Sequence, residues 1–204
     1  SNHPDQFYYK PRIDFDQLKQ VAHKGNLVSF SGHLGSYLGR LAEDNESDDL
    51  ICTAALRMQQ IFGKDNFFIE IQLMDADSNE TSRVTAEKLR QISIKTGIPC
   101  VATPDAHYTT REAAEDQRIL LCTALKKTIG QVQRELKQGG SESLRAFFSS
   151  NNFHIPSFEE MKQYHNDEEL ANTVLIADMC DSYNILGPPN PPEFNCPPGY
   201  SPKE

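Results

Sequence analysis

The alternation of apolar and polar residues predicts three β-strands. The strongest is Phe67–Leu73, in which Phe, Ile, Ile and Leu occupy every second position and so share one face of an extended backbone. Leu27–Phe30 and Pro99–Thr103 are shorter apolar runs, each flanked by glycine, proline or asparagine. Short apolar runs between turn residues are typical of buried strands.

Helices are predicted between and after these strands, where apolar residues recur every three or four positions. One begins at Ser47 or Asp48 and stops at Gly63, with a single apolar stripe along its length. Capping boxes, in which Ser or Thr precedes Glu by three residues, are predicted at Thr109 with Glu112 and at Ser157 with Glu160. The remaining predicted helices are Asp14–His23, Leu34–Ala42, Asn79–Lys95 and Asp167–Cys180, the last with Leu170, Val174 and Ala177 facing inward.

Strands therefore alternate with helices, an order typical of α/β folds in which βα units surround a parallel sheet or barrel. Three strands are few for a closed barrel. Of the 23 glycine and proline residues, nine crowd into Gly187–Pro202, a composition typical of a linker. We expect one domain over residues 1–186 and a proline-rich linker over residues 187–204.

Charge narrows the classes of function. The chain has 29 acidic and 20 basic residues, a net charge of −9, whereas nucleic-acid-binding modules usually present a basic face to phosphates. One segment, Lys126–Arg145, is basic, with five Lys or Arg residues against two Glu residues. A solvated helix face is the favoured interpretation of this segment, and a phosphate-facing patch is the alternative.

Cysteine content and hydropathy bear on location. Five cysteines, an odd number without a CxxC pair, predict free thiols in a reducing compartment. No apolar run approaches the roughly 20 residues of a membrane span, and the first residues lack the apolar core of a signal peptide. We expect a soluble, cytoplasmic protein without a membrane partner.

Metal-ligand residue types follow two of the predicted strands. Asp105 and His107 come directly after Pro99–Thr103, and their two-residue spacing would place both side chains on one side of an extended backbone. His33 comes directly after Leu27–Phe30. Carboxylates and imidazoles bind zinc, manganese or iron, and active sites assemble at the carboxyl ends of parallel strands. The three residues are candidate metal ligands, although a turn aspartate and ordinary histidines would give the same pattern.

Other candidates give weaker signals. Asp75 and Asp77 could bind a hard cation, but such residues after a strand more often form a turn. Glu70 could face a barrel interior or lie on a polar strand face, and His154 and His165 have no partner at ligand spacing. The P-loop, GxSxG and HExxH patterns are absent, which argues against an NTPase, a serine hydrolase or a zincin protease.

Several blocks resemble, in order, segments of the bacterial DNA polymerase III alpha subunit. The most informative is Thr96-Gly-Ile-Pro-Cys-Val-Ala-Thr-Pro-Asp-Ala-His-Tyr108, which is similar to the family's LGIPLVATNDVHY. The other blocks, which extend the resemblance over nearly the whole chain, are Gly25–His33, Phe67–Gln72, Ala113–Cys122, Phe153–Met161, Ala171–Cys180 and Pro191–Tyr200.

The resemblance implies the C-terminal part of a PHP domain, a distorted β/α barrel that holds up to three metal ions. The barrel would be incomplete here, with C-terminal helices and a Pro-rich extension toward the polymerase palm. Asp105 and His107 match the family's last two metal ligands, His33 stands where the family has a cysteine, and Pro104 stands where it commonly has Asn. The family's other ligands and its catalytic palm are not in this sequence, so the fragment alone is expected to be nearly inactive.

The implied function is a part in replicative DNA synthesis, with zinc or manganese in the PHP site and magnesium in a polymerase site outside this chain. The PHP metals would support 3′–5′ exonuclease proofreading. The implied partners are DNA and other replicase subunits, and open sheet edges would favour self-association. Two alternatives stay open: a structural PHP scaffold with a decayed metal site, and a stand-alone PHP phosphoesterase.

Overall fold

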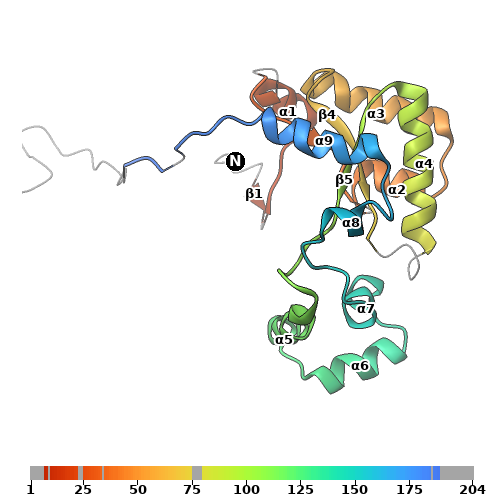
Figure 1. The fold of residues 1–204 in the computed structure, drawn as a ribbon, viewed down its shortest axis with the longest axis vertical. Helices are drawn as coiled ribbons and strands as arrows, with labels where there is room; N and C mark the ends of the chain where they lie inside the picture. The colour runs from red at the N-terminus through yellow and green to blue at the C-terminus, as the bar shows by residue number, and fades with distance from the viewer. Residues whose placement is uncertain are drawn as a thin grey trace, which may run out of the picture.

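The computed structural model describes residues 7–8, 10–22, 25–33, 35–74, 80–184 and 186–188. Three strands lie side by side with helices around them (Figure 1). These three strands are β3 (Ser29–Phe30), β4 (Phe67–Gln72) and β5 (Cys100–Thr103). Two further short strands, β1 (Phe7–Tyr8) and β2 (Lys10–Pro11), pair with each other. The α-helices are α1 (Phe15–Ala22), α2 (Tyr37–Glu43), α3 (Asp48–Phe62), α4 (Glu80–Thr96), α5 (Ala114–Leu125), α6 (Ile129–Lys137), α7 (Glu142–Ser149), α8 (Phe158–Met161) and α9 (Asp167–Asp178).

The three predicted strands form one parallel sheet in the order β3-β4-β5, which confirms the α/β class. The described part of this sheet is open, and the predicted barrel stays a prediction. A short antiparallel pair, β1 and β2, precedes it and was not predicted. Most of the predicted linker lies outside the described residues.

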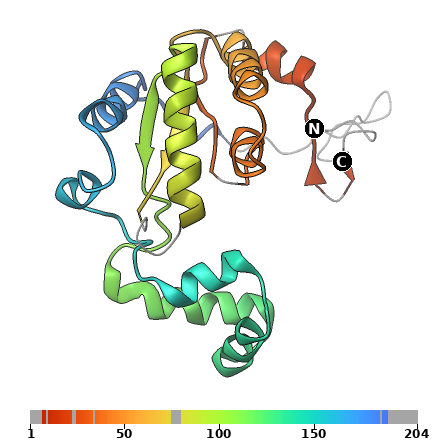
Figure 2. The same ribbon diagram turned by 90° about the vertical axis from the view of Figure 1, so that its right-hand side faces the viewer.

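The central strand β4 carries much of the core. Phe67, Ile69 and Ile71 are fully buried, as their alternation predicts, but Phe68 on the other face is buried as well. A parallel strand becomes apolar on both faces when helices cover both sides of its sheet. Helices α3 and α4 pack on β4, and α9 lies along β5 (Figures 1 and 2).

Two helix starts differ from the sequence prediction. Helix α2 begins at Tyr37 after an N-cap at Ser36, whose hydroxyl accepts a hydrogen bond from the backbone N–H of Gly39. The predicted capping box at Thr109 is wrong. The chain forms a single 3₁₀ turn there, Arg111–Ala113, after Thr110, whose side chain makes no capping bond. By contrast, the capping box of Ser157 and Glu160 is present at α8.

Helix α9 does not pack against the sheet with the face that its apolar periodicity predicts. Leu170 is buried as predicted, but Val174 is 61% exposed and Ala177 is exposed as well. The side that meets β5 carries Leu170, which packs with Ala102, and Asn172, whose side-chain amide donates a hydrogen bond of 2.8 Å to the carbonyl of Cys100. The predicted inward positions of Val174 and Ala177 are therefore wrong.

Helices α5, α6 and α7 form a separate lobe beyond the carboxyl end of β5 (Figures 1 and 2). The predicted basic segment folds here into α6 and α7. The chain enters the lobe through residues 104–110 and returns through residues 150–157. These two connections lie side by side, since Tyr108 and His154 form an isolated parallel bridge. The candidate ligands Asp105 and His107 therefore lie at the neck between sheet and lobe.

Candidate metal site

Asp105 and His107 lie together directly after β5. The Oδ1 atom of Asp105 is 3.2 Å from Nε2 of His107, and the two side chains are 42% and 36% exposed. A turn creates this pair, because Asp105 adopts the left-handed conformation with φ of 51°. Aspartate tolerates that conformation better than most residues, since its short polar side chain bonds locally. The expected juxtaposition is present, although the backbone is not extended as predicted.

The second connection of the neck orients the His107 imidazole. The backbone N–H of His107 donates a 2.7 Å hydrogen bond to the carbonyl of Phe153. The imidazole makes edge-to-face contacts with the aromatic rings of Phe147 and Phe153, at centroid distances of 4.7 and 5.8 Å. Arg118 of α5 donates to the carbonyl of Phe147 and so ties α7 to α5. His107 is held by packing on one side and left open to solvent on the other.

His33 lies in a tight turn after β3. Its Nδ1 atom accepts a 2.9 Å hydrogen bond from the backbone N–H of Gly35. A Cβ atom at position 35 would come within 2.7 Å of the His33 ring, so the close approach requires glycine. The imidazole is exposed and folds back on its own turn.

Strand register separates His33 from the other two candidates. Phe30, the last residue of β3, pairs with Phe68, whereas Thr103 at the end of β5 pairs with Gln72, four residues farther along β4. At about 3.3 Å per residue, the two strand ends are offset by about 13 Å along the sheet. Within the described residues, no group of three or more His, Cys, Asp or Glu side chains lies close enough to hold a metal ion.

Glu70 connects the two strands that lead to the candidate ligands. Its carboxylate accepts a 2.6 Å hydrogen bond from the Thr103 hydroxyl on β5. Its backbone N–H donates a 2.9 Å bond to the Ser31 hydroxyl after β3. Glu70 thus links the central strand β4 to β5 and to the residue after β3, and a position in a barrel interior stays a prediction. The other acidic candidates, Asp75 and Asp77, lie outside the described residues.

Several known proteins similar to this chain are named DNA polymerase III subunit alpha. Over 196 residues it is 34% identical to the DNA polymerase III subunit alpha of Borreliella burgdorferi, covering 94% of this chain and 15% of that protein. The Treponema pallidum protein of the same name is 34% identical over 205 residues, with 97% of this chain and 16% of the relative covered. The Thermus aquaticus protein is 33% identical over 183 residues, with 86% and 13% covered.

This chain is similar, over most of its length, to one part of the bacterial DNA polymerase III alpha subunit. The family model described as the PHP domain matches residues 1–73, which agrees with the PHP resemblance noted in the sequence. The chain spans about one-sixth of the length of these alpha subunits. His33 lies within the PHP match, whereas Asp105 and His107 follow it.

The donor set of this chain fits part of a metal site. One carboxylate and one imidazole stand side by side, open to solvent, and both are ligand types for zinc or manganese. Two protein ligands are fewer than the three or four that hold zinc in most proteins. The pair can therefore contribute to a metal site but does not complete one.

The buried histidine His165 has a structural role. Its Nδ1 atom lies 3.0 Å from the carboxylate of Glu169, and its Nε2 atom lies 3.0 Å from the carbonyl of Leu73 at the end of β4. Glu169 also accepts hydrogen bonds of 2.6 and 2.9 Å from Arg90 of α4. Burial raises the pKa of Glu169, but the hydrogen bonds from Arg90 and His165 outweigh it and lower the pKa to about 2. The cluster ties α4 and α9 to β4.

His154 is also buried, with its Nε2 atom 3.1 Å from Glu160. Hydrogen bonds from the Ser157 backbone and side chain, and then from His154, lower the pKa of Glu160 to about 2. The Nδ1 atom of His154 has no hydrogen-bond partner among the described residues. The sequence analysis missed both histidine–carboxylate pairs. The four-residue spacing of His165 and Glu169 is a signal that could have indicated the first pair. The capping box of Ser157 and Glu160 was predicted, but not the contact of Glu160 with His154.

In the part of the chain that the structure describes, none of the helices has the length and apolar character needed to cross a membrane.

Proposed function

We propose that this chain is a PHP region of a replicative DNA polymerase alpha subunit and that Asp105, His107 and His33 contribute to a divalent metal site. The observation that carries the proposal is the 3.2 Å contact between Asp105 and His107 at the carboxyl end of a parallel strand. Residues 1–186 would form the C-terminal part of the PHP domain, and residues 187–204 would lead toward the polymerase palm.

A divalent metal bound there would polarise a phosphodiester and lower the pKa of a water nucleophile, which is the chemistry of 3′–5′ exonuclease proofreading. Asp105 would supply a hard oxygen ligand, and His107 would supply a nitrogen whose ring is held by Phe147 and Phe153. His33 in place of a thiolate shifts the preference away from the softest metals, toward zinc or manganese.

The whole-protein activities follow from the relatives. An alpha subunit would synthesise DNA with magnesium in a palm site outside this chain, in the cytoplasm, with DNA and other replicase subunits as partners. Supporting this, the identity of about one-third extends over most of the chain in relatives from several bacteria.

Metal content tests the proposal. We expect the full-length alpha subunit to bind zinc or manganese in its PHP domain, and we expect His107→Ala and Asp105→Asn to lower the metal bound there at least fivefold, because each removes one ligand of a small set. Elemental analysis after dialysis against limiting metal measures this.

Asp116→Asn is the matched control, because it removes an exposed carboxylate from α5 without touching the pair. Its metal content should equal that of the wild type. Equal metal content in the wild type, His107→Ala and Asp105→Asn would contradict the proposal.

A structural scaffold with a decayed metal site is the second candidate. The offset between the ends of β3 and β5 favours this candidate. Among the described side chains, His33 is not part of a group of three ligand residues that could hold a metal. Parallel assays of the hydrolysis of single-stranded DNA and of p-nitrophenyl phosphate, both with manganese, distinguish the candidate functions. Because this fragment alone is expected to be nearly inactive, the assays use the full-length alpha subunit. Exonuclease activity there supports the first candidate, phosphomonoesterase activity supports a phosphoesterase, and neither activity supports the scaffold.

A further inference from the structure

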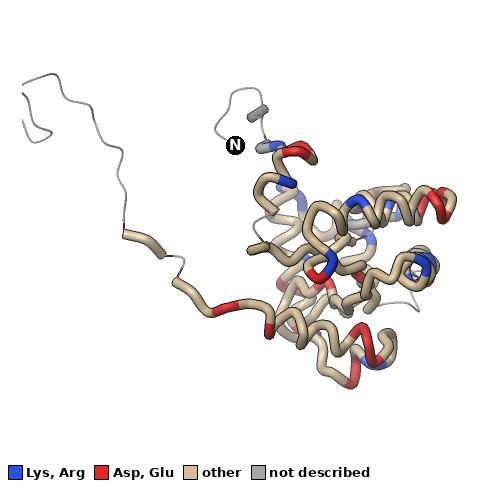
Figure 3. The backbone as a smooth tube through the Cα atoms, turned by 90° about the horizontal axis from the view of Figure 1, so that it is seen from above, with Lys and Arg blue, Asp and Glu red and all other residues tan. Residues whose placement is uncertain are grey.

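Charge is distributed unequally between the lobe and the rest of the molecule. Residues 126–149 carry five basic and two acidic residues, a net charge of +3, whereas the remainder carries 15 basic and 27 acidic residues, a net charge of −12. Over the helices around the sheet, the two kinds of charge are interspersed (Figure 3). A local excess of basic charge raises the concentration of anionic ligands near that surface.

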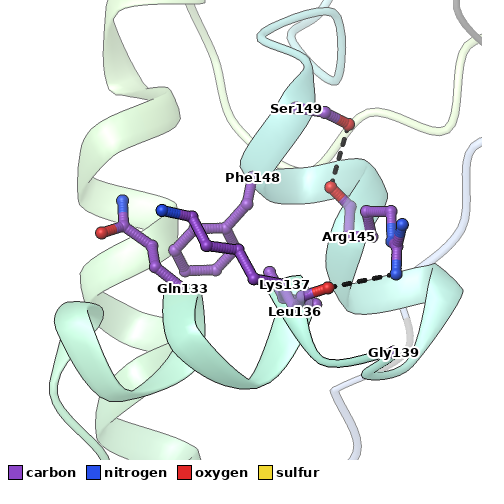
Figure 4. Close-up of a pocket in the computed structure, with 7 residues that line it drawn as sticks. All are labelled: Gln133, Leu136, Lys137, Gly139, Arg145, Phe148 and Ser149. Atoms are coloured by element: carbon purple, nitrogen blue, oxygen red, sulfur yellow. Dashed lines mark hydrogen bonds between the residues drawn. The ribbon is translucent and has the colours of Figure 1, made fainter.

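A groove lies between α6 and α7 in this basic segment. Its volume is about 630 Å³, within the range of about 300–1,000 Å³ typical of ligand sites. Helix α6 contributes Gln133, Leu136 and Lys137, and α7 contributes Arg145, Phe148 and Ser149 (Figure 4). None of the described residues that line it is acidic.

The basic residues that line the groove, Lys137 and Arg145, differ in their surroundings from the neighbouring Lys127. The ammonium of Lys127 is 2.7 Å from the Glu135 carboxylate, which neutralises it. Arg145 donates a 3.2 Å hydrogen bond to the Leu136 carbonyl, a neutral acceptor, and therefore keeps its charge while its guanidinium is held in place. Lys137 and Arg145 thus bring two positive charges to the groove that Phe148 also lines (Figure 4).

The groove adjoins the candidate metal pair through α7. Phe148 lines the groove, and the preceding residue, Phe147, packs against the His107 ring with centroids 4.7 Å apart. Arg118 fixes this part of α7 by donating to the carbonyls of Phe147 and Ser150. Helix α7 therefore lines the groove through Phe148 and contacts the candidate metal pair through Phe147.

We propose that this groove binds single-stranded nucleic acid, with phosphates at Lys137 and Arg145 and a base against Phe148. Single-strand sites combine a positive track for the backbone with an aromatic side chain on which a base stacks. A duplex would not expose its bases to Phe148, and an acidic peptide would not need an aromatic ring. The inference that the groove presents a strand to the metal pair rests on the proposed function; the binding itself does not.

Fluorescence anisotropy with fluorescein-labelled dT12 in EDTA and 50 mM salt tests the binding. We expect Lys137→Glu to weaken binding about tenfold, because it replaces an attraction to phosphate by a repulsion. Phe148→Leu should weaken it several-fold, since stacking is worth about 1–3 kcal/mol per base. The salt dependence should have a slope near −1.4, about −0.7 for each of two phosphate contacts.

Lys64→Glu is the matched control, because it makes the same charge change at an exposed site between α3 and β4. It should change the affinity less than twofold. Equal losses in Lys137→Glu and Lys64→Glu would overturn the proposal, as would undetectable binding by the wild type or equal affinity for polyglutamate or duplex DNA.

Asp105→Asn separates this proposal from the metal site. Because the assay contains EDTA, this variant should bind dT12 like the wild type even if its metal content falls. Normal dT12 binding in a protein that takes up no metal would refute the metal site and leave the groove standing. Normal metal uptake with no dT12 binding would refute only the groove.

Discussion

At the residue scale, the buried cluster of Arg90, His165 and Glu169 is expected to affect the stability of the fold more than the exposed charges do. Both ring nitrogens of His165 face acceptors, the Glu169 carboxylate and the Leu73 carbonyl. The Glu169 carboxylate also accepts two hydrogen bonds from Arg90. One buried carboxylate therefore holds together side chains from three segments of the chain.

This cluster gives the fold an acid sensitivity. The pKa of Glu169 is lowered to about 2 from an ordinary value of 4.5, so its stabilising effect is complete above about pH 5 and is lost as the pH falls toward 2. The linked free energy is on the order of 3 kcal/mol. Urea unfolding at pH 6 and pH 3 should show this loss in the wild type.

Glu169→Gln should remove most of that pH dependence and cost about 3–5 kcal/mol at pH 6, because the partly buried Arg90 loses its counter-charge. Glu168→Gln, the exposed neighbour on the same helix turn, should change stability by less than about 0.5 kcal/mol. A pH dependence that persists in Glu169→Gln would assign the acid sensitivity to other groups.

At the element scale, α9 shows where periodicity misleads. Leu170, Val174 and Ala177 fall at helical spacing, yet Leu170 is 7% exposed and Val174 is 61% exposed. The helix meets β5 through Leu170 and through the hydrogen bond from Asn172 to Cys100. An asparagine that pairs with a strand carbonyl leaves no sequence trace, so the pattern alone placed the buried face wrongly.

Paired substitutions on α9 test this orientation. Leu170→Ala should cost about 2–5 kcal/mol by leaving a cavity. Val174→Ala should cost less than about 0.5 kcal/mol, because its side chain is already in solvent. Thermal or urea unfolding measures both, and a Val174→Ala loss as large as that of Leu170→Ala would contradict the observed orientation.

Other elements could be predicted because their signals are local. Ser47 caps α3, Gly63 ends it with φ of 98°, and β4 follows its apolar alternation. The 3₁₀ turn at Arg111 replaced a predicted cap at Thr109, because the neck pairing of Tyr108 with the return segment determines where the chain turns. That pairing joins residues 46 positions apart, which no local pattern contains.

At the scale of the whole molecule, the candidate site was partly predictable. The residue types and strand positions indicated Asp105 and His107, and the turn at Asp105 brings the two together. The offset of the strand ends depends on register, which the sequence does not give, and it leaves His33 apart from the pair. The β3 edge of the described sheet exposes 40% of Leu27 and 38% of Phe30, and self-association through it stays a prediction.

The most direct test of the metal assignment is the broadening of histidine ring signals in NMR spectra on addition of manganese. Paramagnetic broadening falls steeply with distance, so substoichiometric Mn²⁺ should broaden the His107 signal first and His33 next, leave the buried His165 sharp, and lose its effect in Asp105→Asn. An unchanged His107 signal, or equal broadening of all three histidines in both proteins, would contradict a metal site at the neck.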